Sequence, residues 1–316
     1  MTTTDSMPTP TPASAPPEPV RSSRALARAR KRESAARFWR EYRRHKGGMW
    51  GLAGLIVIAL IALAAPQLVG ADSESVTEAS GGALESPSGA FPLGTDQFGR
   101  SVLALLVWGA RVSLTVGLLA AFLCVAIGTI VGIVAGHFRG WYSTVLMRVT
   151  DWFLVMPTLV LAVALASVMD RSLWTIIIAI GVTTWPTTAR LVRAQTLAVE
   201  SRPYIERARA LGGGHGHIML RHVLPNVMPL VLAQTTLAIS SAILSEATLA
   251  FLGLGDPTIT SWGSMLQDAR AAGAVSAGDW WYLAPPGIAI ALVALAFTLC
   301  GRAIESVLNP KLGVAR

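Results

Sequence analysis

The sequence predicts an all-α membrane protein with six transmembrane helices, and three observations support this fold class. The 316 residues are 53% hydrophobic and only 14% charged, whereas soluble domains carry about 25% charged residues. The apolar residues gather into uncharged windows close to the length of about 20 residues that a helix needs to cross a membrane. Lys and Arg collect in alternate connections between these windows, which is typical of multi-pass membrane proteins.

Six windows define the expected spans in chain order. A cleaved signal peptide is the alternative for the first window, with Ala62–Ala64 as the cleavage pattern. The polar segment before it is too long for a signal peptide, and so is the apolar run, so we expect a retained span. The six windows are 47–71, 112–138, 152–169, 172–189, 223 to beyond 244, and 280–301.

The distribution of basic residues orients the spans. With the N-terminus in the cytoplasm, only Arg100, Arg111, Arg171 and Arg270 fall outside, so 22 of the 26 Lys and Arg lie inside. Basic residues mark the cytoplasmic side of membrane proteins, and we therefore expect both termini in the cytoplasm. The basic tail could instead bind nucleic acid, but its position beside a span favours the membrane interpretation.

The segments around the spans divide the chain into expected regions. Residues 1–46, rich first in Pro, Ser and Thr and then in Arg, form a disordered cytoplasmic tail. The short apolar run 101–110 either lies on the outer surface or extends the second helix, and 260–270 forms a short outer helix. The regions are the tail 1–46, the anchor span 47–71, an extracytoplasmic loop 72–110 and the main transmembrane domain 111–308, with a cytoplasmic loop at 190–222.

The motifs of an ATPase or a metal enzyme are missing from the sequence. A phosphate-binding loop needs a lysine within Gly-x4-Gly-Lys, and the lysines, Lys31, Lys46 and Lys311, have no such context. His215 and His217 are two residues apart and do not share a helix face, so turn positions are a better interpretation than metal ligands. We therefore expect no catalytic residue, no metal site and no cofactor bound by this chain.

One acidic residue, Glu246, lies within an apolar span. Ionisable groups inside membranes often mark ion or substrate pathways. At 1.5 Å per residue, Glu246 lies close to the outer end of a helix that begins near residue 224. A solvated or interfacial carboxylate is therefore the favoured interpretation, and a substrate or proton site is the alternative.

The stretch PYIERARALGGGHGHIMLRHVLPN predicts a short amphipathic helix in the cytoplasmic loop. Pro203 suits a first helical turn, and Glu206 suits the positive end of the helix dipole. The run Gly212-Gly213-Gly214 ends the helix and turns the chain. Such a helix lies on lipid, docks into a groove of another protein, or packs on its own loop. Its apolar face comprises Tyr204, Ile205, Ala208 and Leu211.

This stretch resembles the EAA loop of ABC importer membrane subunits, a signature of Glu-Ala-Ala followed by Gly and then Leu-Pro. The matching residues are Glu206, Ala208, Gly212 and Leu224-Pro225; Arg207 stands in place of the first Ala, and His222 in place of an Ile. The form RALG…RHVLPN is similar to the dipeptide, oligopeptide and nickel branch. Segments 38–63, 91–117, 245–255 and 261–270 also resemble the "C"-type permeases of that branch.

The resemblance implies the type I ABC importer transmembrane fold and a permease subunit in a bacterial plasma membrane. It would form half of a peptide pathway beside a "B"-type permease. Two cytoplasmic ATPases would bind ATP, and an extracytoplasmic binding protein would deliver substrate. The resemblance and the apolar face of the predicted helix together give eight residues expected to couple the chain to the ATPase, and neither names a substrate contact. The eight are Tyr204, Ile205, Glu206, Ala208, Leu211, Gly212, Leu224 and Pro225.

Three alternatives stay open from the sequence. The same machine could carry nickel, a metal chelate, haem or an oligosaccharide. A stand-alone secondary carrier would work without ATPase partners and would need a functional charge within the membrane. A membrane-embedded scaffold or sensor would not transport at all.

Overall fold

A computed structural model describes residues 33, 36–70 and 75–308 of the chain. The chain divides into two units, Met1–Glu41 and Tyr42–Arg316, and every element described below belongs to the second. Most of the predicted tail 1–46 and the C-terminal residues after 308 lie outside the described residues.

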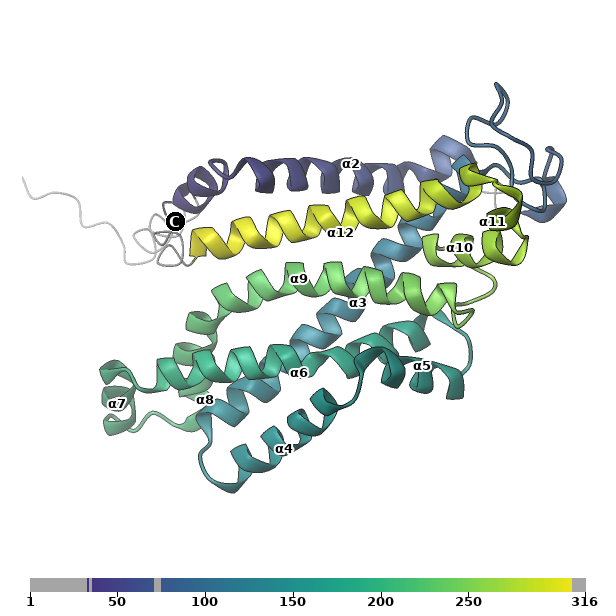
Figure 1. Ribbon diagram of the computed structural model, residues 1–316. Helices are drawn as coiled ribbons and strands as arrows, with labels where there is room; N and C mark the ends of the chain where they lie inside the picture. The colour runs from purple at the N-terminus through teal and green to yellow at the C-terminus, as the bar shows by residue number, and fades with distance from the viewer. Residues whose placement is uncertain (1–32, 34–35, 71–74, 309–316) are drawn as a thin grey trace, which may run out of the picture. The chain divides into compact units, whose positions relative to one another are not determined.

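The described residues form helices and contain no strand, in agreement with the predicted all-α class (Figure 1). Five helical runs are long and apolar enough to cross a membrane, and a sixth crossing is possible if one bent helix pair counts as a span. The five are α2 (Lys46–Val69), α3 (Val102–His137), α6 (Leu173–Glu200), the run from α8 (His215–Ile218) through the π-helical turn η2 (Met219–Val223) to α9 (Leu224–Phe251), and α12 (Trp280–Leu308). The shorter elements are η1 (Val76–Glu78), α4 (Trp141–Val155), α5 (Thr158–Val168), α7 (Pro203–Ala210), α10 (Trp262–Ala271) and α11 (Ala274–Ala277).

The third expected span, 152–169, is not one straight helix. Its residues are shared between α4 and α5, which are bent by 90° at a short break. Pro157 lies at this break, and Met156 before it has the extended backbone that a following proline favours. The apolar window predicted one span from 152 to 169, whereas the structure has two helices, 141–155 and 158–168, that Pro157 separates.

Two helices are longer than the apolar windows predicted. α3 begins at Val102, so the run 101–110 extends the second helix, which is one of the two placements left open by the sequence. α6 continues to Glu200, so residues 190–200 are helical and the expected loop 190–222 began too early. The error has a physical cause, because Arg190 and Arg193 end the apolar window without ending the helix.

α3 and α6 make close contact along a seam of small residues. Gly128, Gly132 and Gly136 recur every four residues and face α6. A Cβ atom added at these glycines would lie 2.6, 2.7 and 2.6 Å, respectively, from atoms of α6, including the Ala189 carbonyl oxygen and the Thr196 side chain. Small residues at this spacing allow two membrane helices to approach backbone to backbone. The nearly constant separation shows that the two helices stay in contact over two turns.

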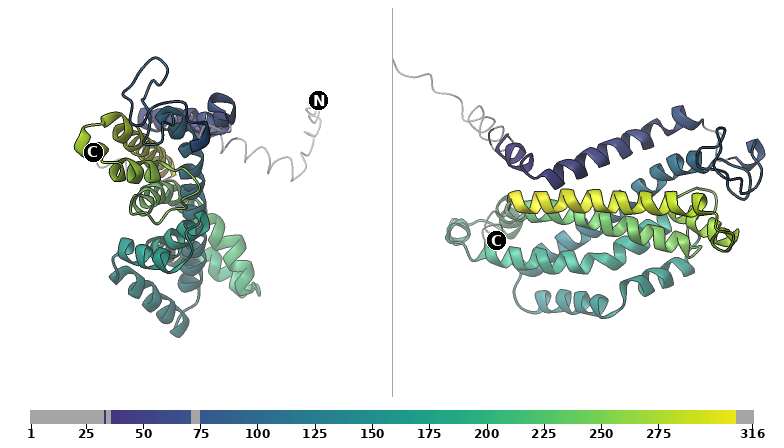
Figure 2. Two further views of the ribbon diagram at one scale, coloured as in Figure 1. Left: turned by 90° about the vertical axis from the view of Figure 1, so that its right-hand side faces the viewer. Right: turned by 45° about the horizontal axis from the view of Figure 1, so that its top comes forward.

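The remaining long helices complete the bundle. α9 packs against α3, α6 and α12, and α2 packs against α12, as the views in Figure 2 also show. At the end where α10 lies, the Trp262 indole nitrogen donates to the Leu106 carbonyl oxygen at 2.9 Å, which joins α10 to the start of α3. This end is the outer one in the topology predicted from the sequence.

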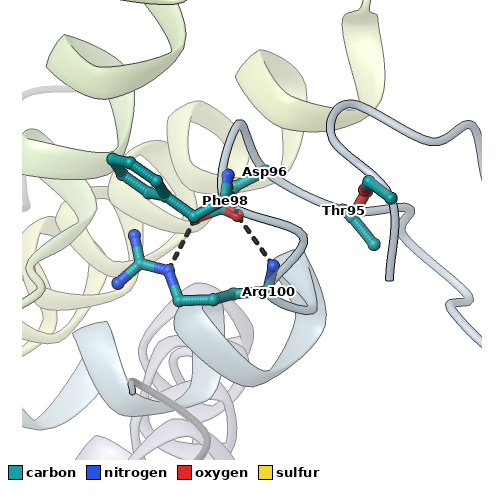
Figure 3. Close-up of polar contacts among 5 residues, drawn as sticks. Thr95, Asp96, Phe98 and Arg100 are labelled. Atoms are coloured by element: carbon teal, nitrogen blue, oxygen red, sulfur yellow. Dashed lines mark hydrogen bonds and ion pairs between the residues drawn. The ribbon is translucent and has the colours of Figure 1, made fainter. Parts of the chain in front are cut away.

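A buried carboxylate organises the loop that leads into α3 (Figure 3). Asp96 Oδ1 accepts hydrogen bonds from the backbone nitrogens of Phe98 and Arg100 at 2.9 and 2.8 Å, and Oδ2 accepts from Arg100 Nε at 2.7 Å. The Thr95 hydroxyl donates to the Gly82 carbonyl oxygen at 2.6 Å, which ties the loop back on itself. The turn therefore has a defined conformation immediately before the first residue of α3.

Candidate coupling segment and transmembrane cavity

The connection between α6 and α9, residues 201–223, carries six of the eight residues that the sequence singled out, and the other two, Leu224 and Pro225, begin α9. We call it the α6–α9 connection. It contains the predicted short helix, α7, with Pro203 in the first turn and Glu206 near the N-terminus. Arg207 and Arg209 lie in the last turn, where cations are favoured by the helix dipole.

Gly212 ends α7 in the way that the sequence predicted. Its φ of 84° is in the left-handed region, which favours glycine. The Gly212 nitrogen donates to the Arg209 carbonyl oxygen and the Gly213 nitrogen to the Ala208 carbonyl oxygen, both at 2.9 Å. This pair of bonds is a Schellman motif. Gly213, which the sequence predicted as part of the same turn, is also required, because a Cβ there would lie 2.7 Å from the Ala208 carbonyl oxygen.

The single apolar face predicted for α7 is divided in the structure. Ile205 is fully buried and packs in a cluster with Val199 and Ile218. Leu211 is 88% exposed and Tyr204 is 36% exposed. Ile205 therefore anchors α7 to its own chain, while Tyr204 and Leu211 stay available to another molecule.

The return into the membrane differs from a simple Leu-Pro turn. Pro225 lacks an N–H and cannot complete an α-helical bond to the carbonyl four residues earlier. The helix adjusts through η2, where the Leu224 nitrogen donates to the Met219 carbonyl oxygen in the π pattern. Asn226 Nδ2 donates to the His222 carbonyl oxygen at 2.7 Å. Leu224 and Pro225 thus sit inside a continuous run from α8 to α9.

A second group of polar side chains was not anticipated from the sequence. His137 and Glu200, at the ends of α3 and α6, meet Arg209 of α7 and His215 of α8. The available signal was that polar residues end two spans at the same side of the membrane. Nothing in the spacing indicated that they would meet. Across the described residues, no group of three or more His, Cys, Asp or Glu is placed to hold a metal ion.

A cavity of about 400 Å³ lies among α4, α5, α6 and α9. Its lining contains no charged side chain and several hydroxyl groups, including those of Thr184, Thr187 and Ser241, with the amide of Gln234. The lining is therefore uncharged, and it combines these hydroxyl and amide groups with apolar side chains such as Phe153, Ile180 and Leu237.

The expectation of a solvated carboxylate at Glu246 is wrong. The side chain lies near the end of α9 as predicted, but the residue is only 3% exposed. Its carboxyl group faces the hydroxyls of Ser113 and Ser261, and Oε2 has no hydrogen-bond partner in the part of the chain that the structure describes. Its position near the end of the helix suggested contact with water, but α3 and α10 pack around the end of α9 and bury the Glu246 carboxyl group.

Comparison with known proteins identifies the family. Residues 128–314 match the family of binding-protein-dependent transport system inner membrane components. The chain belongs to this family. Residues 35–80 match the N-terminal transmembrane domain of oligopeptide transport permease C. The chain is thus a multi-pass permease subunit of an ABC importer, and the ATPase of such importers resides in partner subunits.

Individual relatives agree with this assignment. The chain is 36% identical over 280 residues to the dipeptide transport system permease protein DppC of Alkalihalophilus pseudofirmus, covering 87% of this chain and 90% of that protein. It is 34% identical over 278 residues to the glutathione transport system permease protein GsiD of Pectobacterium atrosepticum, with the same two coverages. A solved structure of the MetNI methionine ABC transporter in inward-facing conformations matches with a TM-score of 0.50 and 21% identity, covering 63% of this chain and 96% of that chain. The last match supports the type I importer fold.

Proposed function

We propose that this chain forms half of the translocation pathway of a peptide importer and couples that pathway to ATP hydrolysis by partner subunits. The dipeptide and glutathione permeases among its relatives both carry short peptides according to their names. The partners would be a second, "B"-type permease, two cytoplasmic ATP-binding subunits and an extracytoplasmic substrate-binding protein. The chain itself would bind no cofactor, since ATP would bind to the partners.

The exposed part of α7 is the observation that carries the coupling proposal. α7 is held to the chain by Ile205 and presents Tyr204, Glu206 and Leu211 to another molecule. A short helix with exposed apolar and charged side chains suits a groove on a partner protein. Closure of the ATPase pair would move this helix, and the spans would respond as a two-state element. The excess of basic residues on the same side supports a cytoplasmic position for α7 and for both termini.

The uncharged cavity suits a pathway for peptides. Its hydroxyl and amide groups offer hydrogen bonds to peptide groups, and the lining has no fixed charge that would hold either terminus. Tight binding would oppose release, because a transported molecule must leave each site that it enters. Selectivity would then reside mainly in the binding protein.

Co-purification tests the partnership. The tagged chain is extracted from its native membrane in mild detergent, and the proteins that accompany it are identified by mass spectrometry. We expect two ATP-binding subunits and a second permease. The attached binding protein would distinguish peptide cargo from nickel, a chelate or haem. A chain that emerges alone or as a homo-oligomer, under conditions that preserve other ABC importers, would contradict the proposal.

Gly212→Asp tests the role of the α7 turn. A side chain at φ 84° costs backbone energy, and a carboxylate is added where the partner would dock. We expect uptake of radiolabelled peptide to be lost while the chain remains in the membrane. Gly212→Asn is the control, because Asn and Asp tolerate the left-handed region alike and only Asp adds a charge. Normal peptide uptake by the Asp variant would show that the turn at Gly212 is not needed for coupling.

A further inference from the structure

Four polar side chains from four helices meet beside α7. Glu200, the last residue of α6, accepts from Arg209 Nη2 of α7 through its Oε2 atom. Glu200 Oε1 lies 2.5 Å from Nδ1 of His137, the last residue of α3. Nε2 of His137 lies 2.9 Å from Nδ1 of His215, the first residue of α8. The chain of contacts therefore runs from α7 through α6 and α3 to α8.

The centre of this cluster is buried. The side chains of His137 and Glu200 are 1% and 4% exposed, whereas that of Arg209 is 43% exposed and reaches in from the surface. A buried carboxylate is unfavourable unless it is paired and hydrogen-bonded. Both Glu200 oxygens have partners, so the position of the carboxylate depends on α3 and on α7 together.

Proton positions in the cluster follow from the donors available. An ionised Glu200 only accepts, so His137 Nδ1 carries a hydrogen. His137 Nε2 then either accepts from a hydrogen on His215 Nδ1 or, when His137 is charged, donates to His215. Either arrangement places one hydrogen between the two rings. If both rings are charged, two N–H groups face each other and this hydrogen bond is lost.

Few other groups act on the two rings. The ring of Phe138 contacts both imidazoles, with centroids 5.0 Å from His137 and 5.2 Å from His215, and Tyr142 of α4 lies behind Phe138. Among the described contacts, the charged groups facing the pair are Glu200 directly and Arg209 through Glu200. Protonation of the second ring therefore meets no additional carboxylate that would hold the rings together.

We propose that His137, Glu200, Arg209 and His215 form a polar clasp that fixes α7 and α8 to the ends of α3 and α6, and that acidification opens it at the His137–His215 contact. This inference rests on the proposed coupling role of α7. The Gly212–Gly214 turn would otherwise let α7 and α8 move separately, and Ile205 alone would link α7 to the bundle by a buried side chain. Because the clasp links α7 to the ends of α6 and α3, a movement of α7 would be transmitted to these two helices, which are packed closely along their glycine seam. All four are positioning residues.

Hydrogen exchange of the full-length chain, purified with the proteins that accompany it, tests the clasp. His215→Ala removes one ring from an exposed position and leaves the buried pair in place. We expect exchange of the amides of residues 204–218 to rise about fivefold, the loss expected for one half-buried hydrogen bond. His217→Ala is the matched control, because His217 lies on the same helix and contacts the ring of His222 instead. Equal exchange in the two variants would overturn the proposal.

The pH profile separates a clasp from an ordinary structural contact. After correction for intrinsic exchange, wild-type protection of residues 204–218 should fall on acidification, because a second proton on the His137–His215 pair places two N–H groups against each other. His215→Asn keeps a nitrogen near the position of Nδ1 and an amide that donates or accepts without titrating. We expect this variant to keep its protection and lose the pH dependence. If protection in His215→Asn or in His215→Ala changed with pH in parallel with the wild type, the result would contradict the clasp.

The outcome separates this inference from the proposed function. If the complex forms and transports peptide but His215→Ala and His217→Ala exchange equally, the clasp is wrong and the coupling role of α7 stands. If no ATP-binding subunit accompanies the chain, the proposed function fails, whatever the exchange shows.

Discussion

Along the α3–α6 seam, three glycines bring two backbones together at nearly constant distance, whereas the α6–α9 connection holds its helix α7 to the chain by one fully buried apolar residue, Ile205. The seam repeats the same contact every four residues. The connection combines an anchor, a Schellman turn and polar contacts, each made once. The seam is therefore built for rigidity, and the connection exposes side chains at Tyr204 and Leu211 for another molecule.

The difference shows how close contact depends on spacing. On α2, Gly48, Gly51 and Gly54 recur every three residues, and a Cβ at these positions would lie 2.4, 2.6 and 3.9 Å from the nearest atom of α12. A three-residue step turns the helix surface away from its partner faster than a four-residue step does. The glycine repeat on α3 thus supports a longer seam than the one on α2.

The largest expected effect comes from the anchor of the connection. Ile205→Ala removes a fully buried side chain, and we expect α7 to lose about 2–5 kcal/mol of stability against local unfolding. Trypsin cleavage after Arg207 and Arg209 in the detergent-purified chain would measure this. Leu211→Ala is the control, since Leu211 is exposed and its loss should leave cleavage unchanged while weakening recovery of ATP-binding subunits. Faster cleavage in the Leu211 variant would mean that Leu211 packs on its own chain.

The seam should respond next. Gly132→Ala places a Cβ 2.7 Å from atoms of α6, and forced overpacking costs about 1–3 kcal/mol. Gly54→Ala adds the same methyl group at ordinary contact distance, and alanine is the better helix former by about 1 kcal/mol. Thermal unfolding in detergent should therefore show a lower Tm for the first variant and an equal or higher Tm for the second. Equal Tm values for the two variants would show that α3 and α6 can move apart to accommodate the added methyl group at little cost.

The turn after α7 should give a smaller effect. Gly213→Ala pushes a Cβ against the Ala208 carbonyl oxygen and weakens the Schellman motif, a loss of about 0.3–1.5 kcal/mol. Gly214→Ala adds a Cβ with no atom within 4 Å. Amide exchange in a peptide covering residues 207–216 should rise only in the first variant. If amide exchange rose in both variants, the cause would be the changed backbone flexibility of the glycine run and not the contact of the Cβ with Ala208.

The smallest effect is expected at the surface. Arg190 Nη2 lies 2.6 Å from Asp151 Oδ1, but the two side chains are 56% and 44% exposed. Exposed ion pairs contribute about 0–1 kcal/mol. Arg190→Ala should lower the Tm by less than Gly132→Ala does, and the change should shrink further in high salt. A larger shift would indicate that this pair joins α4 to α6 more firmly than its exposure suggests.

Much of the fold was predictable because it depends on local pattern. Apolar windows located the spans, and the break at Pro157 could have been expected from the proline itself. Arg190 and Arg193 misled the prediction, because a charged residue ends an apolar window without ending a helix. At the connection, Pro203 and Gly212 correctly marked the bounds of α7, since both act through their own backbone conformation.

The sequence alone determined which segments are apolar enough to span a membrane, where α7 lies and which family signature the chain carries, because hydropathy, helix period and turn residues act over a few neighbouring positions. Only the tertiary structure decided which side of α7 is buried, that Glu246 is enclosed, and that His137 meets Glu200 and His215. These contacts join residues 63 and 78 positions apart. Their formation depends on how α3, α6 and α8 pack together, and no local pattern in the chain contains that information.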